Sequence, residues 1–252
     1  MRISFIIPTY NERENLPDLI DQLLALPLNS HIIVVDDNSP DGTGRLADEL
    51  AAGNKRIHVI HRPTKLGLGT AHIAGMKHAL ENGAEYVLTM DADFSHRPKY
   101  IPALVNLAQT HHVIIGSRYV PGGGVENWEL HRRFLSWGAN RFARLMLGLK
   151  VHDCTAGFRC YRREVLLNLD LDDIFSNGYS FLLEMAYRCR RMRCTFAETP
   201  IIFANRTRGA SKISQTEIFK AMYTVLRLGL TRFYLTRPRP APVSPIRKEA
   251  SG

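Results

Sequence analysis

Long hydrophobic runs and paired cysteines are both missing from this 252-residue sequence. No stretch reaches the roughly 18 uncharged apolar residues that a membrane-spanning helix needs. The first apolar run stops at Pro8 and is too short for a signal peptide, so we expect none. The cysteines lack the C-x-x-C spacing of zinc sites, which predicts reduced thiols in a cytosolic protein; they stand at positions 154, 160, 189 and 194.

Acidic residues are fewer than basic ones. The 33 Lys and Arg against 24 Asp and Glu give a formal net charge of +9. This excess favours anionic partners such as phosphate groups, nucleic acid or an anionic membrane surface. A nucleic-acid-binding module needs a basic face with stacking aromatic residues. The arginines here are instead interleaved with glycines and acidic segments, so we expect no nucleic-acid partner and keep that class as a remote alternative.

Short apolar runs alternate with stretches of helical periodicity, the pattern of an α/β domain. With 45% hydrophobic residues, the chain can bury one large core. This order predicts a mostly parallel central sheet with helices on both faces, and ligands at the carboxyl ends of the strands. Strands are expected at residues 3–8, 32–36, 57–60, 86–90 and 113–116. Helices are expected at residues 16–24, 43–52, 70–82 and 98–108.

The second half of the chain follows a different pattern. Three consecutive glycines at 122–124 predict a loop. Helical periodicity returns at 131–147, 181–190 and 215–235, and residues 194–204 read as extended. Residues 236–252 are rich in proline and charge with few large apolar side chains, which predicts a disordered tail. We expect a single domain over residues 1–235 that divides into halves 1–117 and 118–235.

Two carboxylates one residue apart, Asp91 and Asp93, follow the apolar run 86–90. Hard oxygen ligands at the end of a buried strand suit Mg²⁺ or Mn²⁺, which would bridge the oxygens of a diphosphate. A second acidic pair, Asp36 and Asp37, ends another expected strand and could accept hydrogen bonds from a base and a ribose. Solvated turns are the alternative for both pairs. Because both pairs follow strands, the sequence predicts one shared site.

Arginines recur beside glycines in the expected loops of the second half. Arg118 precedes the triple glycine, Arg132 follows it, and Arg206 and Lys212 flank another glycine. The guanidinium fork suits phosphate oxygens, so as a group they favour a polyphosphate site, although each alone is compatible with a solvated surface residue. His96, three residues past the acidic pair, is expected to be a hydrogen-bonding neighbour of the site rather than a metal ligand. The dipeptide at 111–112 reads as surface histidines.

Eight segments together carry a resemblance to a known family. They read PTYNE at 8–12, DDNSPDGT at 36–43, GLGTA at 67–71, MDADFSH at 90–96, GSRY at 116–119, TAGFR at 155–159, GYSF at 178–181 and RTRGASK at 206–212. In this order, over residues 3–232, they resemble the family 2 glycosyltransferases. Within that family they are similar to the dolichyl-phosphate (polyprenyl-phosphate) mannosyltransferase catalytic subunits.

The resemblance implies a GT-A type nucleotide-diphospho-sugar transferase fold, GDP-mannose as donor, Mg²⁺ or Mn²⁺ as cofactor, and a polyprenyl phosphate as acceptor. It assigns residues 1–117 to the nucleotide sugar and residues 118–235 to the acceptor. The residues that it places around the nucleotide sugar are Pro8, Tyr10, Glu12, Asp37, Asp91, Ala92, Asp93, Arg118, Arg206 and Lys212. Of these, Arg206 and Lys212 fall in a loop that closes over the site.

The same resemblance distributes the chemical roles. It places the cation at Asp91 and Asp93. Ser95 would be a weak third ligand, because some relatives have Gln at this position. Catalytic roles fall on Asp91, Asp93 and Arg118, and the acceptor phosphate on Arg118, Arg132 and Ser136. Since a phosphate monoester is already anionic near neutral pH, the transfer needs no general base. We expect the transfer to invert the anomeric centre.

The last expected helix, 215–235, is amphipathic, and the reading of its apolar side is open. It either packs on the core or lies on a membrane surface, directly or through a small membrane partner. We expect the second, with the protein peripheral on the cytoplasmic face of a membrane. The apolar residues in question are Ile218, Phe219, Met222, Val225, Leu226, Leu230 and Phe233.

Two other enzymatic readings stay open from the sequence alone. A polyprenyl-phosphate glucosyltransferase that uses UDP-glucose would share the fold and the acceptor. A nucleotidyltransferase would share the fold type and release pyrophosphate instead of a nucleoside diphosphate.

Overall fold

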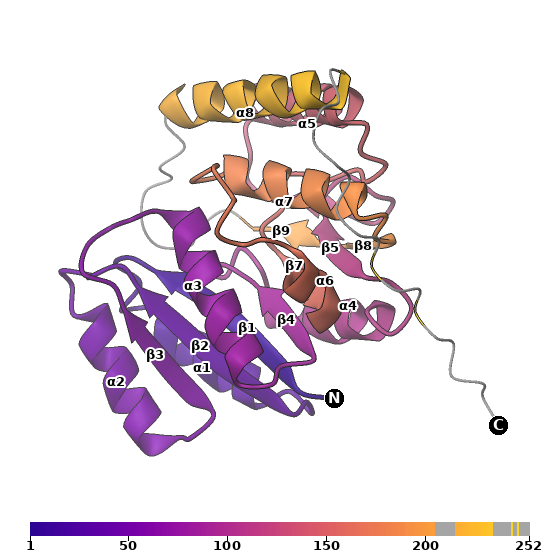
Figure 1. The fold of residues 1–252 in the computed structure, drawn as a ribbon. Coiled ribbons are helices and arrows are strands. Elements are labelled where there is room, and N and C mark those ends of the chain that lie inside the picture. Colours follow the sequence, from indigo (N-terminus) through magenta and orange to yellow (C-terminus); the bar gives the residue numbers. More distant parts are fainter. Residues whose placement is uncertain (205–214, 234–242, 244–245, 247–252) are drawn as a thin grey trace.

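A seven-stranded sheet forms the centre of the molecule in the computed structural model, which describes residues 1–204, 215–233, 243 and 246 (Figure 1). Its strand order is β3-β2-β1-β4-β7-β5-β8. All neighbouring pairs are parallel except those that β7 makes with β4 and β5. The strands are β1 (Ile3–Thr9), β2 (Ser30–Asp36), β3 (Ile57–His61), β4 (Tyr86–Thr89), β5 (Val113–Ser117), β7 (Arg159–Arg162) and β8 (Phe196–Pro200).

Helices cover both faces of this sheet, which confirms the predicted α/β class. They are α1 (Leu16–Leu24), α2 (Thr43–Gly53), α3 (Leu68–Glu81), α4 (Ile101–Leu107), α5 (Leu130–Leu147), α6 (Arg163–Asn168), α7 (Ser180–Arg191) and α8 (Gln215–Phe233). A short 3₁₀ turn, η1 (Pro98–Tyr100), precedes α4, and β6 (Gly124–Val125) pairs with β9 (Ile202–Phe203) as a small second ribbon. The expected strands and helices agree with these bounds within two residues, except that the helix expected at 98–108 divides into η1 and α4. The sequence patterns did not predict β7 or α6.

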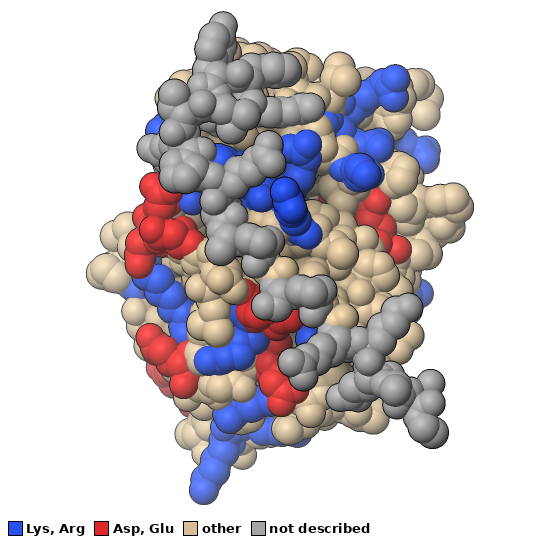
Figure 2. All heavy atoms as spheres, turned by 45° about the vertical axis from the view of Figure 1, so that its right-hand side comes forward, with Lys and Arg blue, Asp and Glu red and all other residues tan. Residues whose placement is uncertain are grey.

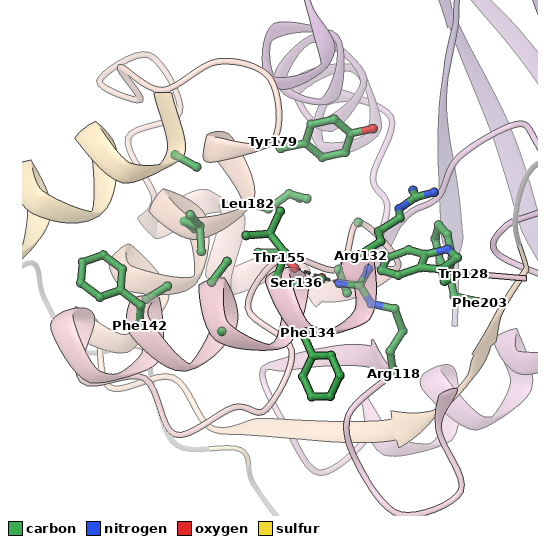
Figure 3. A pocket seen from close by; sticks show the side chains of 18 of the residues that line it. Arg118, Trp128, Arg132, Phe134, Ser136, Phe142, Thr155, Tyr179, Leu182 and Phe203 are labelled. Carbon is green, nitrogen blue, oxygen red and sulfur yellow. Dashed lines mark hydrogen bonds between the residues drawn. The ribbon is translucent and has the colours of Figure 1, made fainter. Parts of the chain in front are cut away.

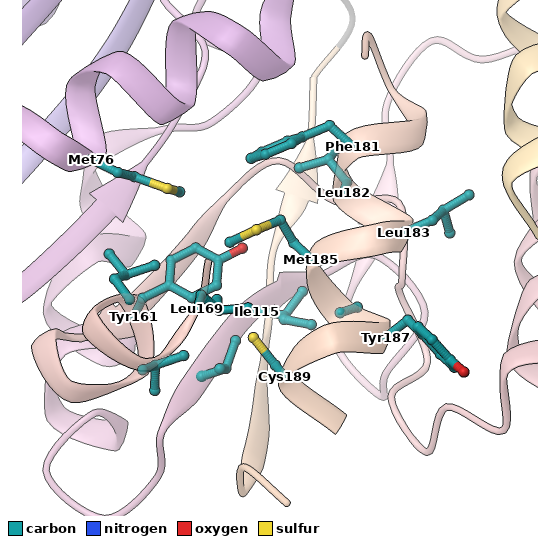
Figure 4. Packing of buried hydrophobic residues seen from close by; sticks show 14 of the residues in the cluster. Met76, Ile115, Tyr161, Leu169, Phe181, Leu182, Leu183, Met185, Tyr187 and Cys189 are labelled. Carbon is teal, nitrogen blue, oxygen red and sulfur yellow. The ribbon is translucent and has the colours of Figure 1, made fainter. Parts of the chain in front are cut away.

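Alternation along the strands divides the core between the two faces. Ile6 of β1 joins the cluster under α3 and α7, whereas its neighbours Phe5 and Ile7 join the cluster under α1 and α4. This follows from the two-residue period of a strand. Figure 4 shows the first cluster, where Met76 of α3 and Met185 of α7 close over the sheet.

Helices α5 and α8 form an additional layer beyond α7. Figure 1 shows α8 lying along α5, with α7 between this pair and the sheet. Two buried apolar side chains of α8, Val225 and Leu228, join the same cluster as Leu147 of α5 and Leu183 of α7. The core-packing reading therefore holds for one side of the helix. The other side is exposed, and its contact with a membrane stays a prediction.

Two further predictions concern His112 and the C-terminal tail. The first is wrong, and the second falls mostly outside the described residues. His112, expected on the surface, is buried next to β8, where Thr195 contacts its Nδ1 atom through both its backbone nitrogen and its hydroxyl group. Of the predicted disordered tail, only Val243 and Ile246 are described. Val243 is buried and donates a backbone hydrogen bond to Met192, and the rest of that prediction lies outside the described residues.

Candidate active site

The acidic pair predicted to bind a cation lies directly after β4, which is a central strand of the sheet. Asp91 is partly exposed and Asp93 is buried, and both line the same cavity. The turn is held by Ser95, whose backbone nitrogen donates to Asp93 Oδ1 at 3.1 Å. Over the residues that the structure describes, no three His, Cys, Asp or Glu side chains converge as a metal site. Two carboxylates fit a cation that takes its remaining oxygen ligands from a diphosphate and water.

His96 stabilises this turn by a hydrogen bond to its backbone. Its Nδ1 accepts a hydrogen bond from the backbone nitrogen of Asp91 at 3.0 Å, and its buried ring stacks on Phe158 with centroids 5.0 Å apart. Because Nδ1 acts as an acceptor, the neutral ring carries its proton on Nε2. The expected role as a hydrogen-bonding neighbour of the acidic pair agrees with this geometry. Ser95 Oγ is buried without a hydrogen-bond partner among the described residues, and its role as a third ligand stays a prediction.

The second acidic pair ends β2, and β1 lies between β2 and β4 in the sheet. Asp36 accepts hydrogen bonds from the hydroxyl groups of Thr9 at 2.9 Å and Ser39 at 2.6 Å, so it stabilises the turn. Asp37 pairs with Arg62 and also accepts from the backbone nitrogen of Gly67 at 3.3 Å. The structure thus assigns a local bonding role to both residues, and a nucleotide-binding role for Asp37 stays a prediction.

Arg62, which the sequence patterns did not single out, links this acidic end to the glycine-rich loop before α3. It donates to the carbonyl oxygen of Gly67 at 3.0 Å and to Thr70 Oγ1 at 2.7 Å. Gly67 has φ of 99°, and a Cβ there would come within 2.6 Å of Asn177, so only glycine fits this turn. The loop is therefore fixed by an ion pair and by backbone geometry together.

The residues predicted from the first strand lie at the same edge. Pro8 is in β1, and Glu12 follows it and accepts from Asn15 Nδ2 at 2.8 Å. Lys65 Nζ lies 3.9 Å from the ring centroid of Tyr10, a cation–π contact. Neither these residues nor Ala92 line the cavity of the acidic pair. Arg206 and Lys212 lie outside the described residues.

Arg118, at the end of β5, is fixed by a residue that the sequence analysis missed. Its Nε and Nη2 donate to the two carboxylate oxygens of Asp153 at 2.7 and 2.8 Å, and Nη2 also donates to Thr155 Oγ1. Burial opposes the charge of each partner, but their mutual attraction outweighs it: the pKa of Arg118 is raised and that of Asp153 is lowered. Asp153 stands two residues before the TAGFR segment, and this closeness was the only available signal.

The other residues expected at a phosphate stand one turn apart on α5. Arg132 and Ser136 share a helix face because they are four positions apart. Ser136 Oγ accepts from the hydroxyl group of Tyr119 at 2.8 Å, and both Arg132 and Ser136 line the cavity with Arg118. The structure therefore brings together the acidic pair and all three predicted phosphate residues.

The cavity that these residues share has a volume of about 800 Å³ and two chemically different ends (Figure 3). The polar end holds the acidic pair and the two arginines. The other end lies between α5, α7 and α8, and it is apolar. Its lining there includes Leu135, Phe142, Ala143, Leu182, Leu183, Ala221, Met222 and Val225.

The fold and this site define a GT-A type glycosyltransferase, and the chain belongs to glycosyl transferase family 2, whose model matches residues 4–170. It is 46% identical over 230 residues to the undecaprenyl-phosphate mannosyltransferase of Micrococcus luteus, a match that covers 91% of this chain and 95% of the relative. It is also 46% identical over 231 residues to the polyprenol monophosphomannose synthase of Mycolicibacterium smegmatis, covering 91% and 87%.

Solved structures of low identity share the fold. The mannosyltransferase PcManGT from Pyrobaculum calidifontis, in complex with GDP-Man and Mn²⁺, has a TM-score of 0.58 at 16% identity. That match covers 97% of this chain and 67% of the other. At this identity the likeness supports the GT-A fold alone.

Proposed function

We propose that this enzyme transfers mannose from GDP-mannose to a polyprenyl phosphate, with inversion at the anomeric carbon. The observation that carries the proposal is the single cavity, in which carboxylates and arginines stand at one end and apolar side chains at the other. A sugar donor with a diphosphate and an acceptor with a phosphate and an isoprenoid chain match these two ends. The names of both close relatives support mannose as the sugar and a polyprenyl phosphate as the acceptor.

The donor end needs a divalent cation, Mg²⁺ or Mn²⁺. Asp91 and Asp93 would hold it through hard carboxylate oxygens, and it would supply charge stabilisation to the departing nucleoside diphosphate. Arg118 adds a fixed positive charge at the same cavity, and as a guanidinium it stays protonated at any physiological pH. The bound Mn²⁺ in the structure of PcManGT supports the choice of cation class.

The acceptor end needs no protein base. A phosphate monoester loses its second proton near pH 6, so it attacks as an anion at neutral pH. His96 is a poor candidate for a base, because its Nδ1 accepts a hydrogen bond from Asp91 and its ring is buried. The protein then contributes positioning of the two substrates and stabilisation of charge on both phosphates.

The apolar end suits the first isoprenyl units of the acceptor. Phe142 and Leu182 point into it from α5 and α7 in Figure 3, and Met222 and Val225 close it from α8. Burying a methylene group contributes about 0.8 kcal/mol, so a few isoprenyl units would add substantially to affinity. This end is also continuous with the outer surface formed by α5 and α8.

That outer surface carries large apolar side chains on both helices. From α8 these include Phe219, Tyr223 and Leu230, and from α5 they include Phe134, Trp137 and Leu145, which are 71%, 54% and 76% exposed. Exposed basic residues of the same helices, Arg133, Arg141, Lys220 and Arg227, accompany them. Figure 2 shows several Lys and Arg side chains close together in the upper half of the face that it presents, and others lower down.

We infer that α5 and α8 together rest on an anionic membrane surface, directly or next to a small membrane partner, and so bring the cavity to the lipid-linked phosphate. Over the described residues, no helix has both the length and the apolar character to span a bilayer. Peripheral attachment on the cytoplasmic face is our prediction for its location. The sequence patterns assigned this role to the last helix alone, and the addition of α5 comes from the structure.

A matrix of donors and acceptors tests the proposal. GDP-mannose and UDP-glucose are each offered with a short polyprenyl phosphate, with and without a chelator, and the released nucleotide is identified. We expect mannose transfer with release of GDP, and loss of activity with the chelator. Preference for UDP-glucose would establish the glucosyltransferase reading, and release of pyrophosphate would establish a nucleotidyltransferase. Unchanged turnover in chelator would remove the cation from the mechanism.

A further inference from the structure

The two arginines at the polar end of the cavity share one aromatic ring. Trp128 lies in the segment between β6 and α5. The Cζ atom of Arg132 is 4.2 Å from the centroid of this ring, and that of Arg118 is 5.7 Å away. Both distances are within the range of cation–π attraction. Figure 3 shows the indole beside both guanidinium groups at this end of the cavity.

This ring is also connected to the acidic pair. Trp128 meets Phe203 edge to face at 5.8 Å between centroids, and Phe203 meets His96 edge to face at 5.5 Å. His96 in turn holds the backbone of Asp91. Aromatic contacts of this kind restrict ring orientation, so the indole has a defined position relative to the carboxylates.

The indole nitrogen gives an independent sign of function. Trp128 Nε1 is buried and has no hydrogen-bond acceptor among the described residues. A buried donor without an acceptor destabilises the fold, and a phenylalanine would fill a similar space without that cost. Packing alone therefore does not explain a tryptophan here, whereas the stronger cation–π attraction of an indole does.

We propose that Trp128 is a positioning residue that holds Arg118 and Arg132 as a convergent pair around the phosphate of the acceptor. The proposal rests on the proposed function for the identity of that phosphate. Two guanidinium groups that face one site repel each other, and a ring within cation–π range of both offsets part of this repulsion. Asp153 and Thr155 engage Nε and Nη2 of Arg118, which leaves Nη1 without a partner among the described residues.

The two tryptophans of the sequence, Trp128 and Trp137, make a direct test possible. In a Trp137→Phe background, the emission of Trp128 is recorded during titration with a short-chain polyprenyl monophosphate, with inorganic phosphate and with GDP plus Mg²⁺. We expect the monophosphate to change the emission in a saturable way, with inorganic phosphate acting at higher concentration. No change at saturating acceptor overturns the proposal. A response to GDP alone assigns the pair to the donor and also overturns it.

The second test compares the KM values for acceptor and donor in variants of Trp128. Trp128→Leu should raise the KM for the short acceptor about ten-fold or more and change the KM for GDP-mannose less than two-fold. Trp128→Phe keeps a ring and should stay within about three-fold of wild type for both. Leu167→Ser, at an exposed position of α6 outside the cavity, should leave both constants unchanged.

The outcomes separate this proposal from the proposed function. An acceptor KM within two-fold of wild type in Trp128→Leu, or an equal rise in both constants, overturns the positioning role. If Trp128→Leu fails to fold, the emission titration decides. A wild-type enzyme that transfers no mannose contradicts the proposed function instead, and the titration still reports whether Trp128 senses a phosphate monoester.

Discussion

The polar part of the molecule at the ends of β1 and β2 (the polar half) differs from the apolar surface of α5 and α8 (the apolar half) in how its side chains are satisfied. At the ends of β1 and β2, polar side chains bond to one another inside the protein: Asp36 to Thr9 and Ser39, and Asp37 to Arg62. On the outer side of α5 and α8, large apolar side chains such as Phe134 and Phe219 have no cover among the described residues and are more than two-thirds exposed. The polar residues are preorganised by their own hydrogen bonds, whereas the exposed apolar side chains form the surface for which we propose lipid contact.

The largest expected effect concerns the acidic pair Asp91 and Asp93, which we propose contacts the donor through a cation. Asp91→Asn or Asp93→Asn keeps the shape of the side chain and removes the charge that a cation needs. We expect kcat/KM to fall by at least about 10³-fold, which corresponds to about 4 kcal/mol of transition-state stabilisation. Initial rates measure this, and thermal unfolding should change little for the partly exposed Asp91. Near-normal activity in both variants would contradict a cation at this pair.

The next largest effect is expected from breaking the ion pair of Arg118 and Asp153. Asp153→Ala leaves a buried guanidinium unpaired, so we expect a loss of about 3–5 kcal/mol in the free energy of unfolding. Arg118→Lys cannot reproduce the fork and should lower activity about 100-fold. Equal stability of Asp153→Ala and wild type in chemical denaturation would exclude a structural pair.

The pH dependence of this pair has a defined sign. Because the pKa of Asp153 is lowered in the folded state, the stabilisation is present above the unfolded value of 3.8 and is lost as the pH falls through the lower folded value. The difference in Tm between wild type and Asp153→Asn should therefore be largest near pH 7 and narrow below about pH 4. A Tm difference that grows as the pH falls would contradict a lowered pKa of Asp153.

The apolar half is tested by removing its exposed residues. The triple variant with Ser at Phe219, Tyr223 and Leu226 should lose co-sedimentation with anionic vesicles and at least about ten-fold of its activity on long-chain acceptors. Activity on a short water-soluble acceptor should be retained, because none of the three lines the cavity. Leu167→Ser, another exposed apolar site, is the control. A folded triple variant that still binds vesicles would place membrane contact elsewhere.

The cavity between the halves is tested at Gly138 of α5. A Cβ added there meets no atom within 4 Å, and the residue lines the cavity. Gly138→Leu should fill the apolar end and raise the acceptor KM about five-fold or more, whereas Gly138→Ala should remain active and stabilise the helix by up to about 1 kcal/mol. Gly53→Leu, at the end of α2 and equally unobstructed, is the matched control. Equal KM in all three would mean that the acceptor lies elsewhere.

The last prediction concerns a buried histidine. His72 of α3 is fully buried against Phe181, and neither ring nitrogen has a hydrogen-bond partner among the described residues. Burial lowers its pKa from 6.5 to about 3, so the unfolded chain binds the proton more readily and stability falls as the pH drops from 6.5 toward 3. His72→Leu should raise stability at pH 7 by about 1–3 kcal/mol and flatten this slope. The His111→Leu variant, at a partly exposed position, should do neither.

The contrast between β4 and β7 shows how far sequence patterns reach. β4 was predicted because a hydrophobic run before a polar turn is typical of a buried parallel strand. β7 escaped prediction because it carries Arg159, whose guanidinium is fully buried and donates to the carbonyl oxygens of Cys154, Ala156 and Leu182. An arginine reads as exposed until the carbonyl groups that satisfy it are known.

The sequence by itself determined the α/β class, the acidic pair after β4, the arginines on the loop and helix that follow β5, and membership of the family. These features depend on periodicity and on short segments, which are local in the chain. Only the tertiary structure revealed that Asp153 holds Arg118, that Arg62 holds Asp37, that Trp128 lies beside two arginines, and that α5 joins α8 in one apolar surface. Each of these contacts joins residues whose spacing in the chain follows no periodic pattern, and their energy comes from desolvation and geometry that exist only after the chain has folded.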